Sequence, residues 1–459
     1  MNLSRRYFLG SFAAAMAAPK FLRAEEPTLK IGLLSDPHVT PDKSTAEPLE
    51  KAFRRFAAEG VGVVVISGDI CHDGKFSELN NVMNAWHAAF PNGLNAHGVK
   101  VEPFFVWGNH DYHDASYMKG KPVTEEDRRS CILYKKDEAW RMVTGEEKHS
   151  GDIFLRKFHG ITFIGAHWGA QNNIGAFLKE HAAEIPTDCP VIYVQHPHPR
   201  GTCFRGWASY DSGKNHAALM EHPNFFCISG HSHASVSFDD SIWSGGFVSM
   251  GAGSMRVVSG RRYEYNANVR KGSNENRYMA SAPVGNAQQA SILSIYSDRV
   301  VLSRHEYLYD EHLGEDWDLP FPFRHNAEKP YVIAEAAEAP QFMPGTEISV
   351  EQKDDFIYPA KTPAKQVRLS FDAASSVGPH SRAVDYRVVI TRAEGGETVA
   401  ERLVAQGLLG LSERRAREYR GYCAFGIDEL PHGVALVATI TPINAGGRGG
   451  KSISKEFKI

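Results

Sequence analysis

The stretch FFVWGNHD, residues Phe104 to Asp111, governs the interpretation of the whole sequence. Its apolar half is typical of a buried β-strand, and the break at Gly108 places Asn109, His110 and Asp111 together at the strand end. An asparagine can offer a carbonyl oxygen to a metal ion, and a histidine can carry a proton. Asp111 is expected to hold the His110 imidazole in position. The stretch therefore predicts a metal or catalytic site at a strand end.

Four other segments share this form, a β-type run that ends in possible metal ligands. They are LLSDPH at 33–38, VVISGD at 64–69, YVQHPH at 193–198 and CISGHSH at 227–233. Residues i and i+2 of an extended segment project together, so Asp36 pairs with His38, and His231 with His233. Each pair could hold one metal ion or straddle two. Asp69 has two carboxylate oxygens and could bridge two ions.

The candidate ligands are nitrogen and oxygen donors, with no thiolate among them. Such a set suits zinc, manganese or iron better than calcium or copper(I). With one bridging carboxylate, the set gives four protein contacts to each of two divalent or trivalent ions. The candidates are Asp36, His38, Asp69, Asn109, His196, His231 and His233.

Composition restricts the other possible functions. A chain of 459 residues is long enough for two or three domains. The net charge of −3, with no block of like charge, argues against a nucleic-acid-binding surface. Six cysteines without a CxxC spacing argue against a zinc knuckle or a thioredoxin-like site. Their possible disulfide pairing stays open.

The N-terminus predicts export. Residues 4–9, SRRYFL, precede a short run of apolar and small residues, and this arrangement resembles a twin-arginine signal peptide over residues 1–24. The run is too short to span a bilayer, which needs about 20 residues. No later segment has the character of a transmembrane anchor. We therefore expect the twin-arginine export machinery as a partner, and a periplasmic or secreted protein.

Strand and helix patterns alternate after the signal, which is typical of an α/β sheet. Strands are expected at Leu29–Ser35, Val61–Ser67 and Val101–Trp107, with helices at Glu47–Glu59 and 76–90. Residues 112–150 are polar and partly helical, at Glu126–Met142, and are expected to be an insertion that caps the site.

Period-two patterns take over from about Glu335, and these predict an all-β sandwich over 335–459. The closing segment TPINAGGRGGKSISKEFKI resembles the end of a fibronectin type III domain. No metal or catalytic signature falls there, so a packing or positioning module is expected.

The ordered set DxH, GD, GNHD, a downstream histidine and GHxH resembles the calcineurin-like metallophosphoesterase family. The resemblance covers residues 29–255, within a domain expected at 25–330, and implies a four-layer αββα sandwich with metals at the strand ends. It assigns Asp36, His38, Asp69 and His233 to one metal. It assigns Asp69, Asn109, His196 and His231 to the other.

Two positions differ from family patterns. The segment QHPHP at 195–199 offers two histidines for one ligand position; His196 directly follows the apolar strand and is preferred, with His198 as the alternative. His72 stands where the purple acid phosphatase branch has a tyrosine, so no tyrosinate–iron chromophore is expected.

The expected activity is hydrolysis of phosphate esters. A metal-bridging hydroxide would attack phosphorus in line, and His110, held by Asp111, would protonate the leaving group. We favour a phosphomonoesterase; the alternative is a phosphodiesterase acting on nucleotides, glycerophosphodiesters or phospholipid headgroups. A cell-surface binding or adhesion protein, with the metal domain as a scaffold, is the alternative from another class.

Overall fold

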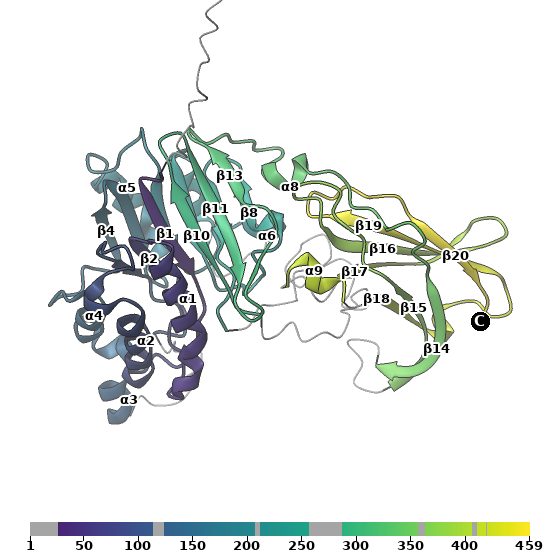
Figure 1. Cartoon of the computed structure of the whole chain (residues 1–459), viewed down its shortest axis with the longest axis horizontal. Helices are drawn as coiled ribbons and strands as arrows, with labels where there is room; N and C mark the ends of the chain where they lie inside the picture. The colour runs from purple at the N-terminus through teal and green to yellow at the C-terminus, as the bar shows by residue number, and fades with distance from the viewer. Residues whose placement is uncertain are drawn as a thin grey trace, which may run out of the picture.

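The structure, a computed structural model, describes residues 26–112, 124–206, 212–256, 287–356, 363–405, 411–418 and 420–459. Figure 1 shows an α/β part, which includes the N-terminal strands, and an all-β part that ends at the C-terminus. The predicted signal peptide lies outside the described residues, as does part of the predicted insertion, at 113–123.

A seven-stranded mixed sheet carries the first three ligand segments. Its parallel strands β1, β2 and β3 lie side by side, and β10 pairs with β1 in the antiparallel sense. The strands are β1 (Leu29–Leu34), β2 (Val63–Ile66), β3 (Glu102–Phe105), β10 (Gln289–Ile295), β11 (Arg299–Glu306), β12 (Glu311–His312) and β13 (Trp317–Pro320).

A six-stranded sheet carries the remaining ligand segments. β5, β6, β7 and β9 are parallel, and an antiparallel strand closes each edge. The strands are β4 (Ile153–Phe158), β5 (Ile161–Ala166), β6 (Val191–Gln195), β7 (Phe225–Ser229), β8 (Ile242–Ser244) and β9 (Val248–Gly251).

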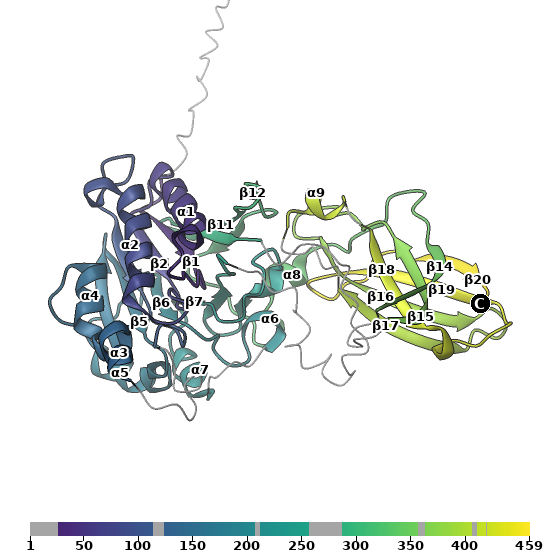
Figure 2. The same ribbon diagram turned by 90° about the horizontal axis from the view of Figure 1, so that it is seen from below.

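The two sheets pack face to face because their strands are apolar on both sides. Val63 and Val65 of β2 point into a core shared with the second sheet, whereas Val64 packs under the outer helices. Helices α1 (Glu47–Ala58) and α2 (Phe76–Ala89) lie side by side over the first sheet (Figure 1 and Figure 2). Helices α5 (Ile174–Glu180) and α7 (Lys214–Leu219) share the outer core of the second. The predicted four-layer αββα arrangement is confirmed.

The predicted helix at Glu126–Met142 is wrong in its continuity. The structure has α3 (Glu125–Ser130), a 3₁₀ turn at Ile132–Tyr134 and α4 (Lys136–Thr144). Between them Cys131 is extended and bridges to Lys75, and the Ile132 amide donates to the Gly74 carbonyl at 2.8 Å. Backbone pairing with a distant loop has overridden local helix preference.

The C-terminal part is a β-sandwich, in agreement with the prediction of an all-β region. A three-stranded sheet and a four-stranded sheet enclose one apolar core that includes Leu369, Tyr386 and Ile440. The strands are β14 (Ser349–Phe356), β15 (Pro363–Phe371), β16 (Ala383–Arg392), β17 (Thr398–Ala405), β18 (Gly421–Gly426), β19 (Leu436–Asn444) and β20 (Ile453–Phe457). The fibronectin type III likeness stays a prediction.

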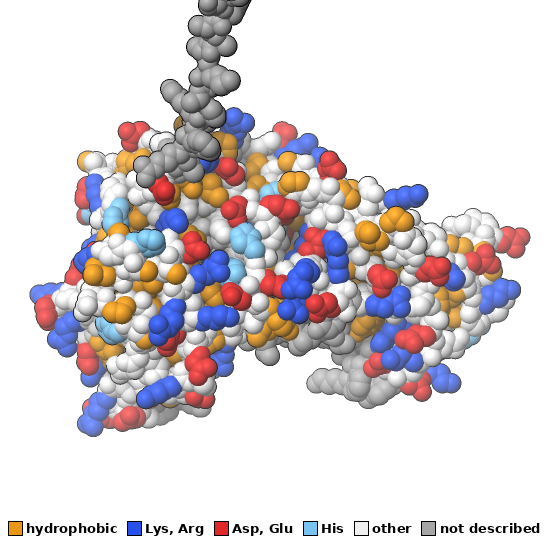
Figure 3. Space-filling view, viewed as in Figure 1, with side chains coloured by type: hydrophobic (Ala, Val, Ile, Leu, Met, Phe, Trp, Pro, Cys, Tyr) orange, Lys and Arg blue, Asp and Glu red, His pale blue; other side chains and the backbone are white. Residues whose placement is uncertain are grey.

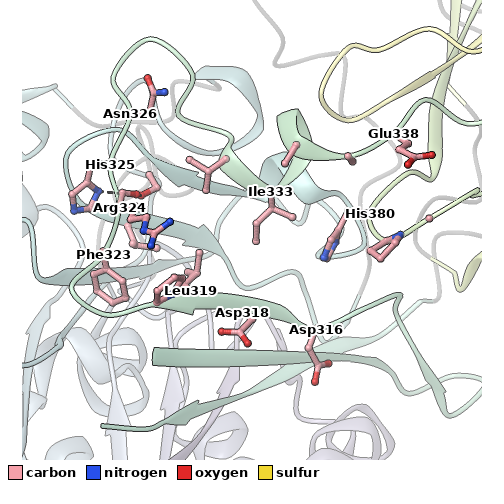
Figure 4. A pocket seen from close by; sticks show the side chains of 18 residues that line it. Asp316, Asp318, Leu319, Phe323, Arg324, His325, Asn326, Ile333, Glu338 and His380 are labelled. Atoms are coloured by element: carbon pink, nitrogen blue, oxygen red, sulfur yellow. Dashed lines mark hydrogen bonds between the residues drawn. The ribbon is translucent and has the colours of Figure 1, made fainter. Parts of the chain in front are cut away.

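The two parts touch through α8 (Val332–Ala336) and through polar contacts. Glu311 bonds Ser412, Arg414 and Arg415 of the segment that contains α9 (Glu413–Ala416). A cavity of about 740 Å³ lies at this junction. Figure 4 shows that its lining includes the apolar Leu319, Phe323 and Ile333 together with charged side chains such as Asp318 and Arg324.

Charged side chains of both signs are interspersed over the face seen in Figure 3, in keeping with the balanced composition. All six cysteines are described and none forms a disulfide; five are buried and Cys189 is half-buried. Within the described ranges, no helix has the length and apolar character needed to cross a membrane.

Candidate metal centre

The candidate ligands meet because five parallel strands end at one place. Asp36, Asp69, Asn109, His196 and His231 lie one to four residues beyond the ends of β1, β2, β3, β6 and β7. In open α/β sheets the carboxyl ends of strands form the usual ligand-binding edge. The two packed sheets therefore bring loops far apart in sequence into one cluster.

The cluster divides into two groups of donors. Asp36, His38 and His233 form one, and Asp69, His196 and His231 form the other; within each group the ligand atoms lie within 4.8 Å of one another. His231 and His233 therefore straddle the two groups.

Asp69 joins the groups. Its Oδ2 lies 3.1 Å from His196 Nε2 and 3.7 Å from His38 Nε2. This position suits a carboxylate that bridges two cations, as the sequence predicted.

The donor atoms are arranged as a cation would require. His38 Nε2 faces His233 Nε2 at 3.1 Å, and His231 Nδ1 faces His196 Nε2 at 3.2 Å. The buried Oδ1 of Asn109 has no hydrogen-bond partner among the described residues. Converging nitrogens and an unpaired buried oxygen are costly unless a further group satisfies them. The residues fit two metal ions.

A second contact fixes the direction of His196. Its Nδ1 lies 2.7 Å from the Ser67 carbonyl oxygen. A carbonyl can only accept, so Nδ1 carries a proton, and Nε2 is the nitrogen that faces Asp69. Metal-binding histidines usually make this kind of contact.

The ligand loops have an unusual backbone, which corrects one expectation. Asp36, His38, Asp69, His231 and His233 all have positive φ, between 43° and 67°. The expected extended backbone at DxH and HxH is therefore wrong, although the paired side chains do converge. A side chain other than glycine adopts this region at a cost, and such residues concentrate at functional sites.

Glycines within the motifs permit close approach. A Cβ at Gly108 would lie 2.2 Å from Asp69 Oδ1, and one at Gly230 would lie 2.5 Å from Asp36 Oδ2. Any larger residue would displace the carboxylates. The glycines of GNHD and GHSH therefore have a steric role in the site.

Asp111 does not hold the His110 ring, so that prediction is corrected. Its carboxylate instead accepts backbone N–H groups of Ile70, Cys71 and Gly108, at 2.7–3.2 Å. It thus fastens the loop after β2 to the loop after β3. A buried carboxylate is satisfied better by three amides that converge on it than by one ring nitrogen.

The His110 ring is held by a backbone carbonyl. Its Nδ1 lies 2.7 Å from the oxygen of His72, so Nδ1 is the donor in this contact and Nε2 is the nitrogen turned away from that carbonyl. Its backbone N–H donates to Asp69 Oδ1 at 2.8 Å. The backbone and the ring of His110 are therefore both tied to the loop after β2.

His198 has a supporting role. Its Nδ1 lies 2.6 Å from Ser229 Oγ, and its Nε2 lies 2.8 Å from Ser232 Oγ. Burial lowers its pKa to about 3, so the ring is neutral. Ser232 stands between His231 and His233, so His198 braces the loop that presents both.

The two central carboxylates are anionic. Burial alone raises the pKa of Asp36, but the neighbouring imidazoles, His233 first, outweigh it and hold the pKa far below its usual range. The same balance, with His196 foremost, lowers the pKa of Asp69 to about 2. Both residues therefore present negative charge to a cation at neutral pH.

Sequence reasoning missed three residues beside the site. Ser254 Oγ donates to the Asp36 carbonyl at 3.1 Å, and Arg256 donates to the His38 carbonyl at 3.0 Å. The Trp168 ring lies 5.5 Å from that of His231. None stands in a ligand-type motif, so no pattern signals it.

Residues 29–235 match the family model described as calcineurin-like phosphoesterase. This part of the chain is a calcineurin-like phosphoesterase domain. The match spans every candidate ligand from Asp36 to His233, and the domain is that of a metal-dependent phosphoesterase.

Solved structures resemble part of the chain at low identity. One is a dimetal phosphatase from Danio rerio, with 13% identity over 64% of this chain and 100% of that chain, and a TM-score of 0.36. Another is GAP50, the anchor in the inner membrane complex of Plasmodium, with 14% identity, coverage of 65% and 90%, and a TM-score of 0.37. No curated protein matches the chain.

Proposed function

We propose that this protein is a dinuclear-metal hydrolase of phosphate esters that prefers monoesters. The observation that carries the proposal is the pair of donor groups joined by Asp69, with His110 directly beside them. Two metal ions in such a site acidify a water molecule and neutralise charge on phosphoryl oxygens.

The protein's own groups supply the remaining steps. His110 keeps Nδ1 bonded to a carbonyl, so protonated Nε2 can give its proton to the departing alkoxide. Asp36 and Asp69 are ionised and buried. They would keep the phosphoryl group that reacts oriented between the two donor groups. No nucleophilic serine or cysteine is required.

The monoester preference rests on side chains beyond the ligand set. Ring nitrogens of His72 and His110 lie within 4.8 Å of one another and of a His38 nitrogen. A monoester offers such side chains one more anionic oxygen than a diester does. Hydrogen bonds to ionised oxygens are stronger than those to neutral ones, which favours the monoester.

The test is hydrolysis of a chromogenic phosphomonoester and its matching diester. Metal-stripped protein is reloaded with zinc, manganese or iron, and Asp69→Ala is compared with the exposed control Asp188→Ala. We expect monoester turnover to fall by about 10³-fold or more in Asp69→Ala and to persist in Asp188→Ala. Dominant diester turnover would replace the monoester assignment with a phosphodiesterase. If protein that binds two ions hydrolyses neither substrate, the proposed activity is contradicted.

Export belongs to the same proposal. The motif SRRYFL at 4–9 supports a twin-arginine signal, which would carry the folded protein to the periplasm or beyond. Arg5→Lys/Arg6→Lys is expected to keep the protein in the cytoplasm, as measured by cell fractionation. Unchanged export of that variant would contradict export through a twin-arginine signal.

A further inference from the structure

Arg256 connects two of the ligand loops from a third segment of the chain. It follows β9 by five residues, and its half-buried side chain reaches the loops that follow β1 and β2. Its Nη1 donates to the His38 carbonyl at 3.0 Å and contacts His72 Nδ1 at 3.1 Å. The two hydrogens of one guanidinium nitrogen are thus shared between a backbone atom and a ring atom.

The second contact determines where the proton of His72 lies. A guanidinium can donate hydrogen bonds and cannot accept them. His72 Nδ1 must therefore be the acceptor, which leaves the proton on Nε2. His72 is held as a neutral ring whose Nε2–H is a donor.

His110 is held in the opposite form. Its Nδ1–H donates to the His72 carbonyl at 2.7 Å, so its Nε2 carries the lone pair or the transferable proton. The two rings stack, with centroids 5.4 Å apart and planes at 22°. Adjacent histidines of the same site are thus set in different tautomers by two fixed contacts.

We propose that Arg256 is a positioning residue that fixes the Nε2–H tautomer of His72, so that His72 donates a hydrogen bond to a terminal phosphoryl oxygen of the substrate. This inference rests on the proposed phosphoesterase activity. This role follows from the chemistry of the contact: a ring locked as a donor at Nε2 can orient an anionic phosphoryl oxygen.

A purely structural role for Arg256 makes a different prediction. The bond to the His38 carbonyl also ties the loops together. If this bond were the only role of Arg256, removing Arg256 would disturb the loop. The size of that effect would then be the same whichever residue stood at position 72. The tautomer role instead requires the effect to pass through the His72 ring.

The first measurement is the tautomer itself. Full-length, zinc-loaded protein with ¹⁵N-labelled histidine is studied by long-range ¹H–¹⁵N correlation, with His72 assigned by its absence in His72→Gln. We expect Nε2–H in the wild type and in Arg256→Lys, which keeps a donor, and a mixture with Nδ1–H in Arg256→Met. A wild-type Nδ1–H ring, or no change in Arg256→Met, would overturn the proposal.

The second measurement is a double-mutant cycle in which calorimetry measures the affinity of each variant for inorganic phosphate. The amide of His72→Gln can donate from the position of Nε2 whatever residue 256 is. We expect Arg256→Met to weaken phosphate binding about tenfold with His72 present, and by less than about twofold in the His72→Gln background. An equal loss in both backgrounds would overturn the proposal, because Arg256 would then act directly or through the loop.

Different results would contradict the proposed phosphoesterase activity and the proposed role of Arg256. Absence of ester turnover in the wild type, alongside the expected tautomer and phosphate cycle, would contradict the proposed reaction and leave the role of Arg256 in anion binding supported. Normal turnover with an unchanged tautomer in Arg256→Met would contradict the role of Arg256 alone.

Discussion

His196 and His198 are two residues apart and both fully buried, yet their surroundings differ. One nitrogen of His196 bonds a backbone carbonyl, and the other faces the Asp69 carboxylate at 3.1 Å. Both nitrogens of His198 bond serine hydroxyls. The first is oriented as a metal ligand, and the second stabilises the loop between β7 and β8.

These surroundings predict opposite effects of removal. His198→Ala removes one hydrogen bond from each of two buried hydroxyls and opens a cavity, so we expect a loss of about 2–4 kcal/mol of stability, with two ions still bound at saturating zinc. His196→Ala should bind at most one ion. Denaturant unfolding and metal analysis of both proteins measure these effects. Loss of an ion in His198→Ala, with full loading of His196→Ala, would reverse the assignment.

The role of His110 predicts a dependence on the leaving group. His110→Asn keeps a donor near the His72 carbonyl but removes the atom that protonates the leaving oxygen. We expect kcat to fall about 10²–10⁴-fold for an alkyl phosphate and far less for a nitrophenyl phosphate, whose leaving group needs no proton. Steady-state rates on a series of leaving groups measure this. An equal loss across the series would show that His110 is not the acid.

The grouping of the candidate ligands was predictable because each motif joins a strand end to a donor residue. The role of Asp111 was not, because it depends on three amides from two loops. Arg256 was missed for a related reason. Its partners, His38 and His72, are about 200 residues away in the sequence, and no local pattern records such a contact.

At the scale of elements, the strands were predicted to within about two residues because buried parallel strands are continuous apolar runs. The left-handed backbone of the ligand loops was not predictable, since aspartate and histidine do not require it. The surrounding structure imposes it through contacts such as that of the His231 amide with Asp36 Oδ2 at 2.9 Å.

This loop geometry predicts the effect of filling the space at Gly230. A Cβ there would come within 1.8 Å of Ser35 Oγ, so Gly230→Ala should displace the loop after β1 or the loop after β7. We expect loss of at least one bound ion and a lower Tm. Gly378→Ala, where a Cβ meets nothing within 4 Å, is the matched control and should behave as the wild type. Full metal loading of Gly230→Ala would contradict the steric role of this glycine.

At the scale of the whole molecule, Glu311 fastens the sandwich to the phosphoesterase domain. Burial raises its pKa, but Ser412, Arg414 and Arg415 outweigh this, so the net pKa lies below its ordinary value. A lowered carboxyl pKa stabilises the folded state above the ordinary value and loses that effect as the pH falls through the lowered one. The junction should therefore loosen in acid.

Glu311→Gln tests the junction. We expect a lower Tm than in the wild type at pH 7, and a difference that begins to shrink as the pH falls below the ordinary carboxyl pKa of about 4.3 and vanishes below the lowered one. Turnover at pH 7 should change little, because the metal ligands lie elsewhere. Calorimetry across this pH range measures the difference. A difference that grows in acid would show that the Glu311 pKa is not lowered in the folded state.

None of the six thiols is bonded to another, and we expect the protein to be insensitive to thiol oxidation. Five are shielded by packing, and burial raises the pKa of Cys71, Cys203 and Cys423, so little reactive thiolate is offered to an oxidant. The fold therefore contains no bond between thiols that a reductant could break. A change in ambient potential is therefore expected to leave the bonding of these thiols as it is.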